Sequence, residues 1–379
     1  MGDKNFGKNK RLKIAIHNPR VSYFLGGTEI TIIEFCKILS LKYDVTLVTS
    51  LNKKTQNFKE FVRGNSSIKV KYFNCPEENE FLITDRLNGW DFEGICFGEE
   101  TRDYYELTNF DLIICFYLGD IITLNKKDSK VVLHLQGYPN NEKILDRIAF
   151  SKVDFKICCS KHVSEKIYEK FGEKINNIYY SSPNLKEFTP KKIKRDIDIL
   201  YLGRLTERKG ADILIKSLKN FKKNYKCVIA GKGDMGEKLK NLIEEFNLQN
   251  NIKLIGAVQK EDTINLLNRS KIFVLPAKTK EPFSKAIIEA MCMGCTVIST
   301  PVGGIPEVMN DNYNGLLVES NNERKLTDSI EFLLSNEKEL KRLSKNAKKD
   351  ILIKFEKIKK EKEFLDLYDR IIGGINAKS

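Results

Sequence analysis

The segment from Glu281 to Glu289 holds the side chains best suited to chemistry in this sequence. Its two carboxylates are separated by seven residues, with Glu281 in a predicted loop and Glu289 two turns into a predicted helix. Carboxylates accept hydrogen bonds from vicinal hydroxyl groups, and backbone amides at a helix start, here those of Phe283 and Ser284, suit phosphate groups. With Lys285 beside them, these groups predict a site for a ligand that carries both hydroxyls and phosphates.

A second set of candidates follows a predicted strand, in the segment Gly203 to Gly210. Arg204 and Lys209 lie where an open α/β sheet places its ligands, beyond the carboxyl ends of its strands. Fixed positive charge there would stabilise a departing diphosphate as negative charge develops on it. The alternative is a solvated basic loop, because isolated arginine and lysine side chains usually contact water. One strand later, Gly231 opens another glycine-rich turn, which either contacts a nucleotide or only turns the chain.

Glycines also follow the first predicted strand. Gly26 and Gly27 stand at a strand-to-helix turn, where exposed amides and the helix N-terminus suit a phosphate or a sugar hydroxyl. Equally, the glycines only make the turn and Thr28 caps the helix. The spacing is not G-x-G-x-x-G, so no nicotinamide dinucleotide site is predicted.

The elements that must position these groups alternate along the chain. Short β-rich runs and amphipathic stretches of helical length are typical of parallel sheets covered on both faces by helices, so the predicted fold class is α/β. Residues 74–110 contain the one tryptophan and show no clean period, and we expect an irregular insertion there. The expected strands cover residues 13–16, 45–49, 68–73, 111–116, 131–135, 155–159, 197–202, 226–230, 252–255, 272–275, 296–299 and 315–318, with helices over 28–41 and 160–170 and a helical end from 322.

A length of 379 residues suits two domains, each with its own core. Prolines and a charge cluster between residues 183 and 192 break the periodicity as an interdomain linker does. The predicted first domain covers residues 1–185, and a linker over 186–195 leads to a second domain over 196–355. A helix over 356–379 follows, which can cross back to the first domain.

Composition excludes several classes of protein. No apolar run approaches the ~20 residues of a membrane span, and no apolar signal core follows the polar start of the chain, so a cytoplasmic protein is expected. Most of the nine cysteines lie in apolar runs, which favours thiols packed in a reducing compartment. Cys292 and Cys295 form a C-x-x-C pair without a second pair, which favours helix packing over a zinc site.

The net charge of +14 is unevenly distributed. Residues 1–185 hold 27 basic and 24 acidic side chains, and residues 186–379 hold 38 and 27. This excess fits nucleotide diphosphates, anionic lipid headgroups or nucleic acid, but the lysines alternate with acids and lack a stacking surface, so no nucleic-acid partner is predicted. The lysine-rich C-terminal helices either rest on an anionic membrane or are solvated helices packed on their domain.

Taken together, these segments resemble a retaining GT-B glycosyltransferase of the family-4 type, also described as glycosyl transferases group 1. The resemblance runs over nearly the whole chain and rests on the order and spacing of its motifs. These are Gly26-Gly27-Thr28-Glu29, His134 within Val132–Leu135, Gly203-Arg204-Leu205 with Arg208-Lys209-Gly210, Glu281 with Glu289, Gly303-Gly304-Ile305-Pro306-Glu307, and Asn314-Gly315-Leu316-Leu317-Val318.

The resemblance implies two Rossmann-like domains that face each other across a cleft, with a nucleoside-diphosphate sugar bound mainly by residues 196–320. Residues 13–180 would bind a glycan or lipid-linked acceptor. Arg204 and Lys209 would hold the pyrophosphate, Glu289 the ribose and Glu281 the donor sugar. His134 would reach that sugar from the first domain, although without the resemblance a structural histidine is the better interpretation.

The resemblance also implies retention of configuration, with no cofactor beyond the donor. No Asp-x-Asp cluster suggests a divalent ion, so activity should persist in chelator. The sequence departs from the family pattern where Ser284 replaces a frequent glycine and where Leu185 follows Asn184 in place of glycine. Two other functions stay open at this point: a sugar-nucleotide 2-epimerase of similar architecture, and a basic module that binds nucleic acid or membrane.

Overall fold

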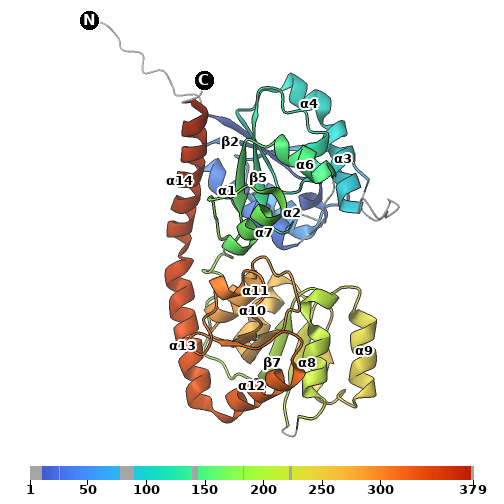
Figure 1. Ribbon diagram of the computed structural model, residues 1–379, viewed down its shortest axis with the longest axis vertical. Coiled ribbons are helices and arrows are strands. Elements are labelled where there is room, and N and C mark those ends of the chain that lie inside the picture. The colour runs from blue at the N-terminus through green and yellow to red at the C-terminus, as the bar shows by residue number, and fades with distance from the viewer. Residues whose placement is uncertain are drawn as a thin grey trace, which may run out of the picture. The chain divides into compact units, whose positions relative to one another are not determined.

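The computed structural model describes residues 11–24, 26–76, 89–138, 144–181, 183–221 and 224–376 (Figure 1). The chain divides into two compact units. The first unit comprises Met1–Cys159, Ser164–Tyr179 and Glu361–Ser379, and the second comprises Ser160–Val163 and Tyr180–Lys360. Residues 1–10 at the polar start, residues 77–88 of the expected insertion and Ser182 beside the expected linker lie outside the described residues.

The first unit is built on a sheet of six parallel strands in the order β3-β2-β1-β4-β5-β6. Apolar runs such as Leu112–Cys115 are buried along their whole length because helices cover both faces of the sheet (Figure 1). The strand order reverses between β1 and β4, so the segments that follow these two strands meet at the carboxyl edge. The strands are β1 (Lys13–His17), β2 (Asp44–Ser50), β3 (Lys69–Phe73), β4 (Leu112–Cys115), β5 (Lys130–Leu135) and β6 (Phe155–Cys158).

Helices connect these strands. Asn18 starts the first connection, because its side-chain oxygen accepts hydrogen bonds from the backbone N–H groups of Arg20 and Val21 and so begins a short 3₁₀ turn. The helical elements are η1 (Arg20–Ser22), α1 (Gly27–Ser40), α2 (Gln56–Gly64), α3 (Gly89–Glu100), α4 (Arg102–Leu107), α5 (Gly119–Ile122), α6 (Ile144–Ser151) and α7 (Lys161–Phe171), whose first turn is assigned to the second unit.

Helices α3 and α4 correct the expectation of an irregular insertion over residues 74–110. The amphipathic period is absent from α3 because the helix is buried on more than one side, and its buried positions include three glycines. Gly94 and Gly98 allow α5 to approach closely. A Cβ atom on Gly94 would lie 2.7 Å from the backbone nitrogen of Asp120.

The second unit repeats the architecture, with six parallel strands in the order β12-β11-β10-β7-β8-β9. Here the order reverses between β7 and β10. All twelve expected strands are present, with ends shifted by at most two residues, which confirms the predicted α/β class with two parallel sheets. The strands are β7 (Ile197–Leu202), β8 (Cys227–Ala230), β9 (Ile252–Leu254), β10 (Ser270–Leu275), β11 (Thr296–Ser299) and β12 (Leu316–Leu317).

The C-terminal part of the second unit is helical. Asn322 and Asn336 cap α12 and α13, since each side chain accepts a hydrogen bond from the backbone N–H three residues later. Among the residues that the structure describes, no helix has both the length and the apolar composition of a membrane span. The helical elements of this unit are η3 (Glu207–Lys209), α8 (Ala211–Leu218), α9 (Gly236–Glu245), α10 (Lys260–Arg269), α11 (Lys285–Cys292), η4 (Ile305–Glu307), α12 (Glu323–Ser335) and α13 (Glu337–Lys354).

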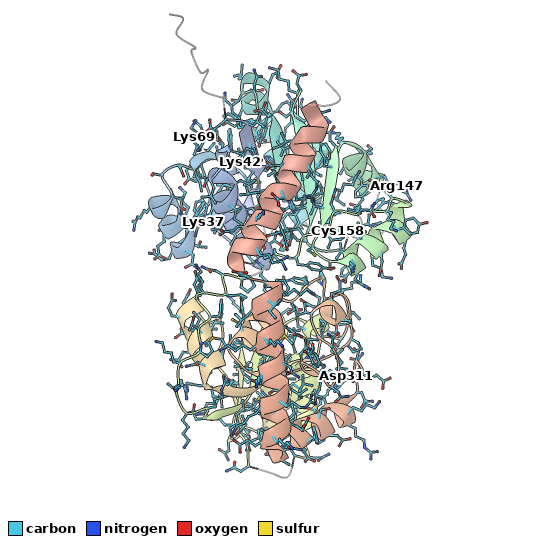
Figure 2. The ribbon with its side chains drawn as sticks, turned by 90° about the vertical axis from the view of Figure 1, so that its left-hand side faces the viewer. Lys37, Lys42, Lys69, Arg147, Cys158 and Asp311 are labelled. Atoms are coloured by element: carbon cyan, nitrogen blue, oxygen red, sulfur yellow. The ribbon has the colours of Figure 1, made fainter. Side chains whose placement is uncertain are left out.

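The last helix, α14 (Lys357–Asn376), contributes its residues from Glu361 onward to the first unit. Phe364 and Tyr368 are buried there, with the ring of Phe364 4.2 Å from that of Phe35. On the outside, Lys42 forms a 2.6 Å ion pair with Asp369 (Figure 2). The apolar stripe of α14 is therefore part of the core of the first unit.

Replacing Gly94 with alanine should destabilise the first unit by about 1–3 kcal/mol, because the new methyl group would overlap the backbone of α5. Chemical denaturation measures this change. Gly373→Ala is a matched control, since nothing lies within 4 Å of a Cβ at that helical position. It should leave stability unchanged or raise it by about 0.5–1 kcal/mol. A Gly94→Ala protein as stable as the wild type would contradict the close packing of α3 on α5.

Candidate functional site

The candidate site lies in the second unit, where the segments after β7 and β10 meet at the carboxyl edge of the sheet. Because β7 and β10 are neighbours on opposite sides of the point where strand order reverses, their connections diverge and leave room for a ligand. Lys209 lies in η3 after β7, and Glu281 lies in the loop after β10. The topology therefore brings together two segments that are 72 residues apart in the sequence.

A buried ion pair connects the two segments. Lys209 Nζ donates a hydrogen bond to Glu281 Oε2 at 2.5 Å, and the two side chains are 13% and 4% exposed. Arg208 lies 3.5 Å from the same carboxylate oxygen and donates a second hydrogen bond, at 3.0 Å, to the carbonyl oxygen of Lys280. One carboxylate thus faces two cations.

Electrostatics make Lys209 unusual among the lysines. Burial lowers its pKa, and the positive charges of Arg208 and Arg204 act in the same direction, while Glu281 opposes them. Arg204 itself is exposed, and its carbonyl oxygen accepts a hydrogen bond from the Tyr201 hydroxyl at 3.1 Å. The predicted pair Arg204 and Lys209 is thus close enough to interact, and Arg208 joins it.

Backbone geometry at two positions makes this arrangement possible. Gly210 ends η3 with φ of 73°, and a Cβ atom there would overlap the carbonyl oxygen of Pro276. On the other segment, Lys280 has φ of 49°, a left-handed conformation that is uncommon for a residue with a side chain. The turn at Lys280 directs the following residue, Glu281, back toward η3.

Glycines also bring the neighbouring loops together. Gly231 has φ of 154°, and a Cβ atom there would overlap the carbonyl oxygen of Gly203. The backbone N–H of Gly203 donates to the carbonyl oxygen of Ala230 at 3.1 Å. The two predicted donor-binding glycines therefore pack against each other and set the distance between the loops after β7 and β8.

The loop that carries Glu281 is supported from η4. The backbone N–H of Gly304 donates to the carbonyl oxygen of Glu281 at 2.8 Å. Phe283 packs on Tyr180, with ring centroids 5.4 Å apart, and Tyr180 donates a 2.7 Å hydrogen bond to Glu307. Gly304 and Glu307 belong to a motif of the resemblance for which the sequence suggested no role.

The remaining predicted residues of this segment start helix α11. Ser284 is buried at the N-cap position, and Lys285 is the first helical residue. Glu289 lies one turn into α11, not two as expected, because the helix begins at Lys285. Burial, together with the charge of Glu289, raises the pKa of the Cys292 thiol to about 11. These observations place Glu289 near Cys292, on the same helix that Ser284 begins.

His134 occupies a different environment from the one expected of a residue that reaches a sugar. It is 1% exposed in β5 of the first unit, and its Nε2 shares a 2.7 Å hydrogen bond with the Tyr368 hydroxyl. The rings of Phe116 and Tyr368 stack on it. Burial lowers the pKa of His134 to about 3. The structure therefore gives His134 the position of a core histidine, because α14 covers it.

Gly26 and Gly27 lie at the start of α1 in the first unit. Gly26 is the N-cap residue, and its backbone N–H donates a 3.2 Å hydrogen bond to Glu29 Oε2. A Cβ atom on Gly26 would lie 2.6 Å from that oxygen, whereas nothing lies within 4 Å of a Cβ on Gly27. The carboxylate of Glu29, and not Thr28, caps this turn.

The stability of the protein should fall between pH 6.5 and 5 in part because of His134. In the unfolded chain the histidine binds a proton as the pH falls through 6.5, whereas the folded protein binds it only near pH 3. His134→Phe should reduce the slope of unfolding free energy against pH by up to about 1.4 kcal/mol per pH unit, as measured by denaturation at several pH values. Tyr368→Phe keeps the histidine and should keep the slope. An unchanged slope in His134→Phe would contradict the buried neutral ring.

Comparisons with known proteins agree with this geometry. Residues 184–350 match the family model described as glycosyl transferases group 1. An uncharacterized glycosyltransferase of Methanocaldococcus jannaschii is 25% identical over 96% of this chain and its own full length. A Campylobacter jejuni enzyme, N-acetylgalactosamine-N,N'-diacetylbacillosaminyl-diphospho-undecaprenol 4-alpha-N-acetylgalactosaminyltransferase, is 26% identical over 88% of this chain and 93% of its own.

The solved structures extend the likeness to the whole fold. Anabaena HepE in complex with UDP and glucose has a TM-score of 0.77 at 17% identity, covering 95% of this chain and all of its own. Its low identity limits the inference to architecture, which is that of two parallel six-stranded sheets with flanking helices. Residues 184–350 are therefore a glycosyl transferases group 1 domain, and the chain as a whole has the fold of a GT-B glycosyltransferase.

Proposed function

We propose that this protein transfers a sugar from a nucleoside-diphosphate sugar to a glycan or lipid-linked acceptor, with retention of anomeric configuration. The observation that carries the proposal is the ion pair between Lys209 and Glu281 at the carboxyl edge of the second sheet. A sugar joined to two phosphates needs cations for the phosphates and an acceptor group for the hydroxyls. This pair supplies both within one contact distance.

The chemistry follows from the charges. Departure of the nucleoside diphosphate is the costly step, because negative charge develops on the phosphates. Lys209 and Arg204, with Arg208 beside them, stabilise that charge in a site where burial weakens the competition from water. As the donor binds, the phosphates replace Glu281 as the partner of Lys209, and the released carboxylate accepts hydrogen bonds from the sugar.

The other predicted residues complete this proposal. Glu289 holds the ribose hydroxyls, and the amides of Phe283 and Ser284, with Lys285 at the start of α11, face the phosphates. The turns at Gly203 and Gly231, and Gly26 and Gly27 in the first unit, bring bare backbone to the donor. A donor phosphate oxygen takes the acceptor proton, so that no carboxylate of the protein serves as a nucleophile and no metal or other cofactor takes part.

The acceptor is proposed by analogy with the relatives. The printed name of the Campylobacter jejuni enzyme describes an acceptor linked to diphospho-undecaprenol. An acceptor of this kind would bring the protein to the inner face of the membrane, where the lysine-rich C-terminal helices meet anionic headgroups from the cytoplasm.

A thermal-shift screen against UDP, UDP-glucose, UDP-N-acetylglucosamine, UDP-N-acetylgalactosamine and the corresponding GDP sugars tests the donor class, since a ligand that binds only the folded state raises its apparent stability. Mass spectrometry of products with an acceptor then separates transfer from isomerisation of the donor. A protein stabilised by no nucleotide or nucleotide sugar would end the proposal.

Lys209→Ala should lower the turnover number on the order of a hundredfold, because it removes a cation that stabilises the leaving group. Lys271→Ala is the matched control, since Lys271 pairs with Asp198 at 2.7 Å and begins near the amino end of β10. The control removes one lysine charge and one ion pair but should keep turnover within about twofold of the wild type. Equal loss in the two variants would refute the role of Lys209.

Glu281→Gln should separate nucleotide binding from sugar transfer. The amide removes the negative charge that competes for Lys209, so UDP should bind at least as tightly as in the wild type. Turnover with the sugar donor should fall by about tenfold or more, because the amide is a weaker acceptor for the sugar hydroxyls. Calorimetry with UDP and steady-state kinetics measure the two quantities. Weaker UDP binding with unchanged turnover would show that Glu281 does not contact the sugar.

A further inference from the structure

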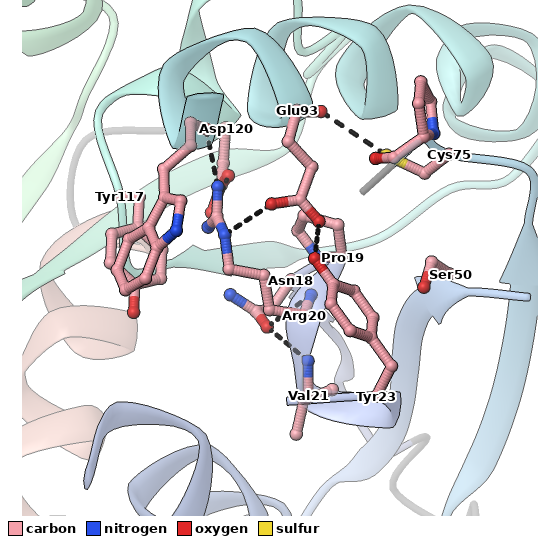
Figure 3. Close-up of polar contacts among 12 residues, drawn as sticks. Asn18, Pro19, Arg20, Val21, Tyr23, Ser50, Cys75, Glu93, Tyr117 and Asp120 are labelled. Carbon is pink, nitrogen blue, oxygen red and sulfur yellow. Dashed lines mark hydrogen bonds and ion pairs between the residues drawn. The ribbon is translucent and has the colours of Figure 1, made fainter. Parts of the chain in front are cut away.

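A second buried cation lies in the first unit, at the carboxyl end of β1. Arg20 is 1% exposed, and η1 directs it into the protein because Asn18 fixes the turn that precedes it (Figure 3). Its Nε lies 2.6 Å from Glu93 Oε2 on α3, and its NH1 lies 3.7 Å from Asp120 Oδ1 on α5. Its NH2 donates a 2.5 Å hydrogen bond to the carbonyl oxygen of Trp90. One guanidinium therefore joins three segments that are far apart in the sequence.

Two aromatic rings enclose the guanidinium. The centre of the guanidinium lies 4.5 Å from the ring centroid of Tyr117 and 5.0 Å from that of Trp90. The hydroxyl of Tyr117 donates a 3.0 Å hydrogen bond to Glu29 Oε1. The other carboxylate oxygen of Glu29 accepts the 3.2 Å hydrogen bond from the backbone of Gly26. A continuous set of contacts thus leads from Arg20 through Tyr117 and Glu29 to the Gly26–Gly27 turn.

The charges in this cluster do not balance. Glu29, Glu93 and Asp120 are each at most 1% exposed, and Arg20 is the cation that all three carboxyl groups share in the surrounding described residues. Burial raises the pKa of Asp120 to about 7, with Glu93 adding to the rise and Arg20 opposing it. Buried ionic groups of this kind are weak contributors to stability compared with apolar packing, but they select one geometry strongly. Selection of geometry is therefore the effect to expect from this cluster.

We propose that Arg20, Tyr117 and Glu29 are positioning residues, which hold the Gly26–Gly27 turn in the conformation that the transfer reaction requires. This proposal rests on the proposed function for its effect on catalysis. Its structural part stands alone, because each contact belongs to the first unit. Glu29 caps the turn, Tyr117 fixes Glu29, and the guanidinium against which Tyr117 stacks is itself held by Glu93 and Asp120.

Two tyrosine variants test the proposal as a matched pair. Tyr117→Phe removes the hydroxyl that fixes Glu29 but keeps the ring on Arg20. Tyr23→Phe removes a hydroxyl that bonds Glu93, on the side of Arg20 away from the turn. Both lose one hydrogen bond between a tyrosine and a buried carboxyl group, so a general loss of stability should be similar in the two proteins.

Hydrogen exchange of the backbone amides of Gly26, Gly27 and Thr28 should become about tenfold faster in Tyr117→Phe and stay within about twofold of the wild type in Tyr23→Phe. With the donor that the nucleotide-sugar screen identifies, kcat/KM for transfer should fall by about tenfold in Tyr117→Phe alone, while the Kd for UDP, measured by calorimetry, stays unchanged in both variants. Equal exchange and equal kcat/KM in the two variants would overturn the proposal. A wild-type protein that binds no nucleotide would overturn the proposed function instead, and the exchange comparison would still decide the role of Tyr117.

Discussion

The ion pair between Lys209 and Glu281 is the interaction on which the candidate site depends. Both charges are almost removed from water, and the cost of that removal is recovered only if the two groups meet with good hydrogen-bond geometry. The pair therefore requires that the segments after β7 and β10 lie at one fixed distance. It also keeps a cation and a carboxylate ready at the same place, which a ligand with phosphates and hydroxyls can then separate.

The backbone meets this requirement through positions that admit no side chain. Gly210 allows η3 to lie against Pro276, and Gly231 allows the loop after β8 to lie against Gly203. Gly304 supports Glu281 from behind through a backbone hydrogen bond. The glycines of this site thus serve close approach between loops of the protein itself, whatever contacts they make with a ligand.

The two units share one arrangement at the carboxyl edge of the sheet. In each, a buried cation comes from the segment after the first strand of the sheet, Arg20 after β1 and Lys209 after β7. In each, a buried acid comes from across the point where strand order reverses, Asp120 after β4 and Glu281 after β10. The difference lies in access. Lys209 has an exposed arginine beside it, whereas Arg20 is enclosed by two aromatic rings and three carboxyl groups. The first is suited to bind an anion and the second to hold the protein in one conformation.

The sequence by itself determined the α/β class, the twelve strands and the segments that form the site, because apolar periodicity and turn residues are local properties of the chain. The pairing of Lys209 with Glu281 was foreseen as proximity, since parallel strands bring their following loops to one edge. Tertiary structure alone decided the rest. Helix α3 was missed because burial on several sides removes an amphipathic pattern. His134 became a core residue because α14, more than 200 residues later, covers it with Tyr368. The buried cluster around Arg20 depends on three separate segments, and no local pattern records which distant acid a buried cation will meet.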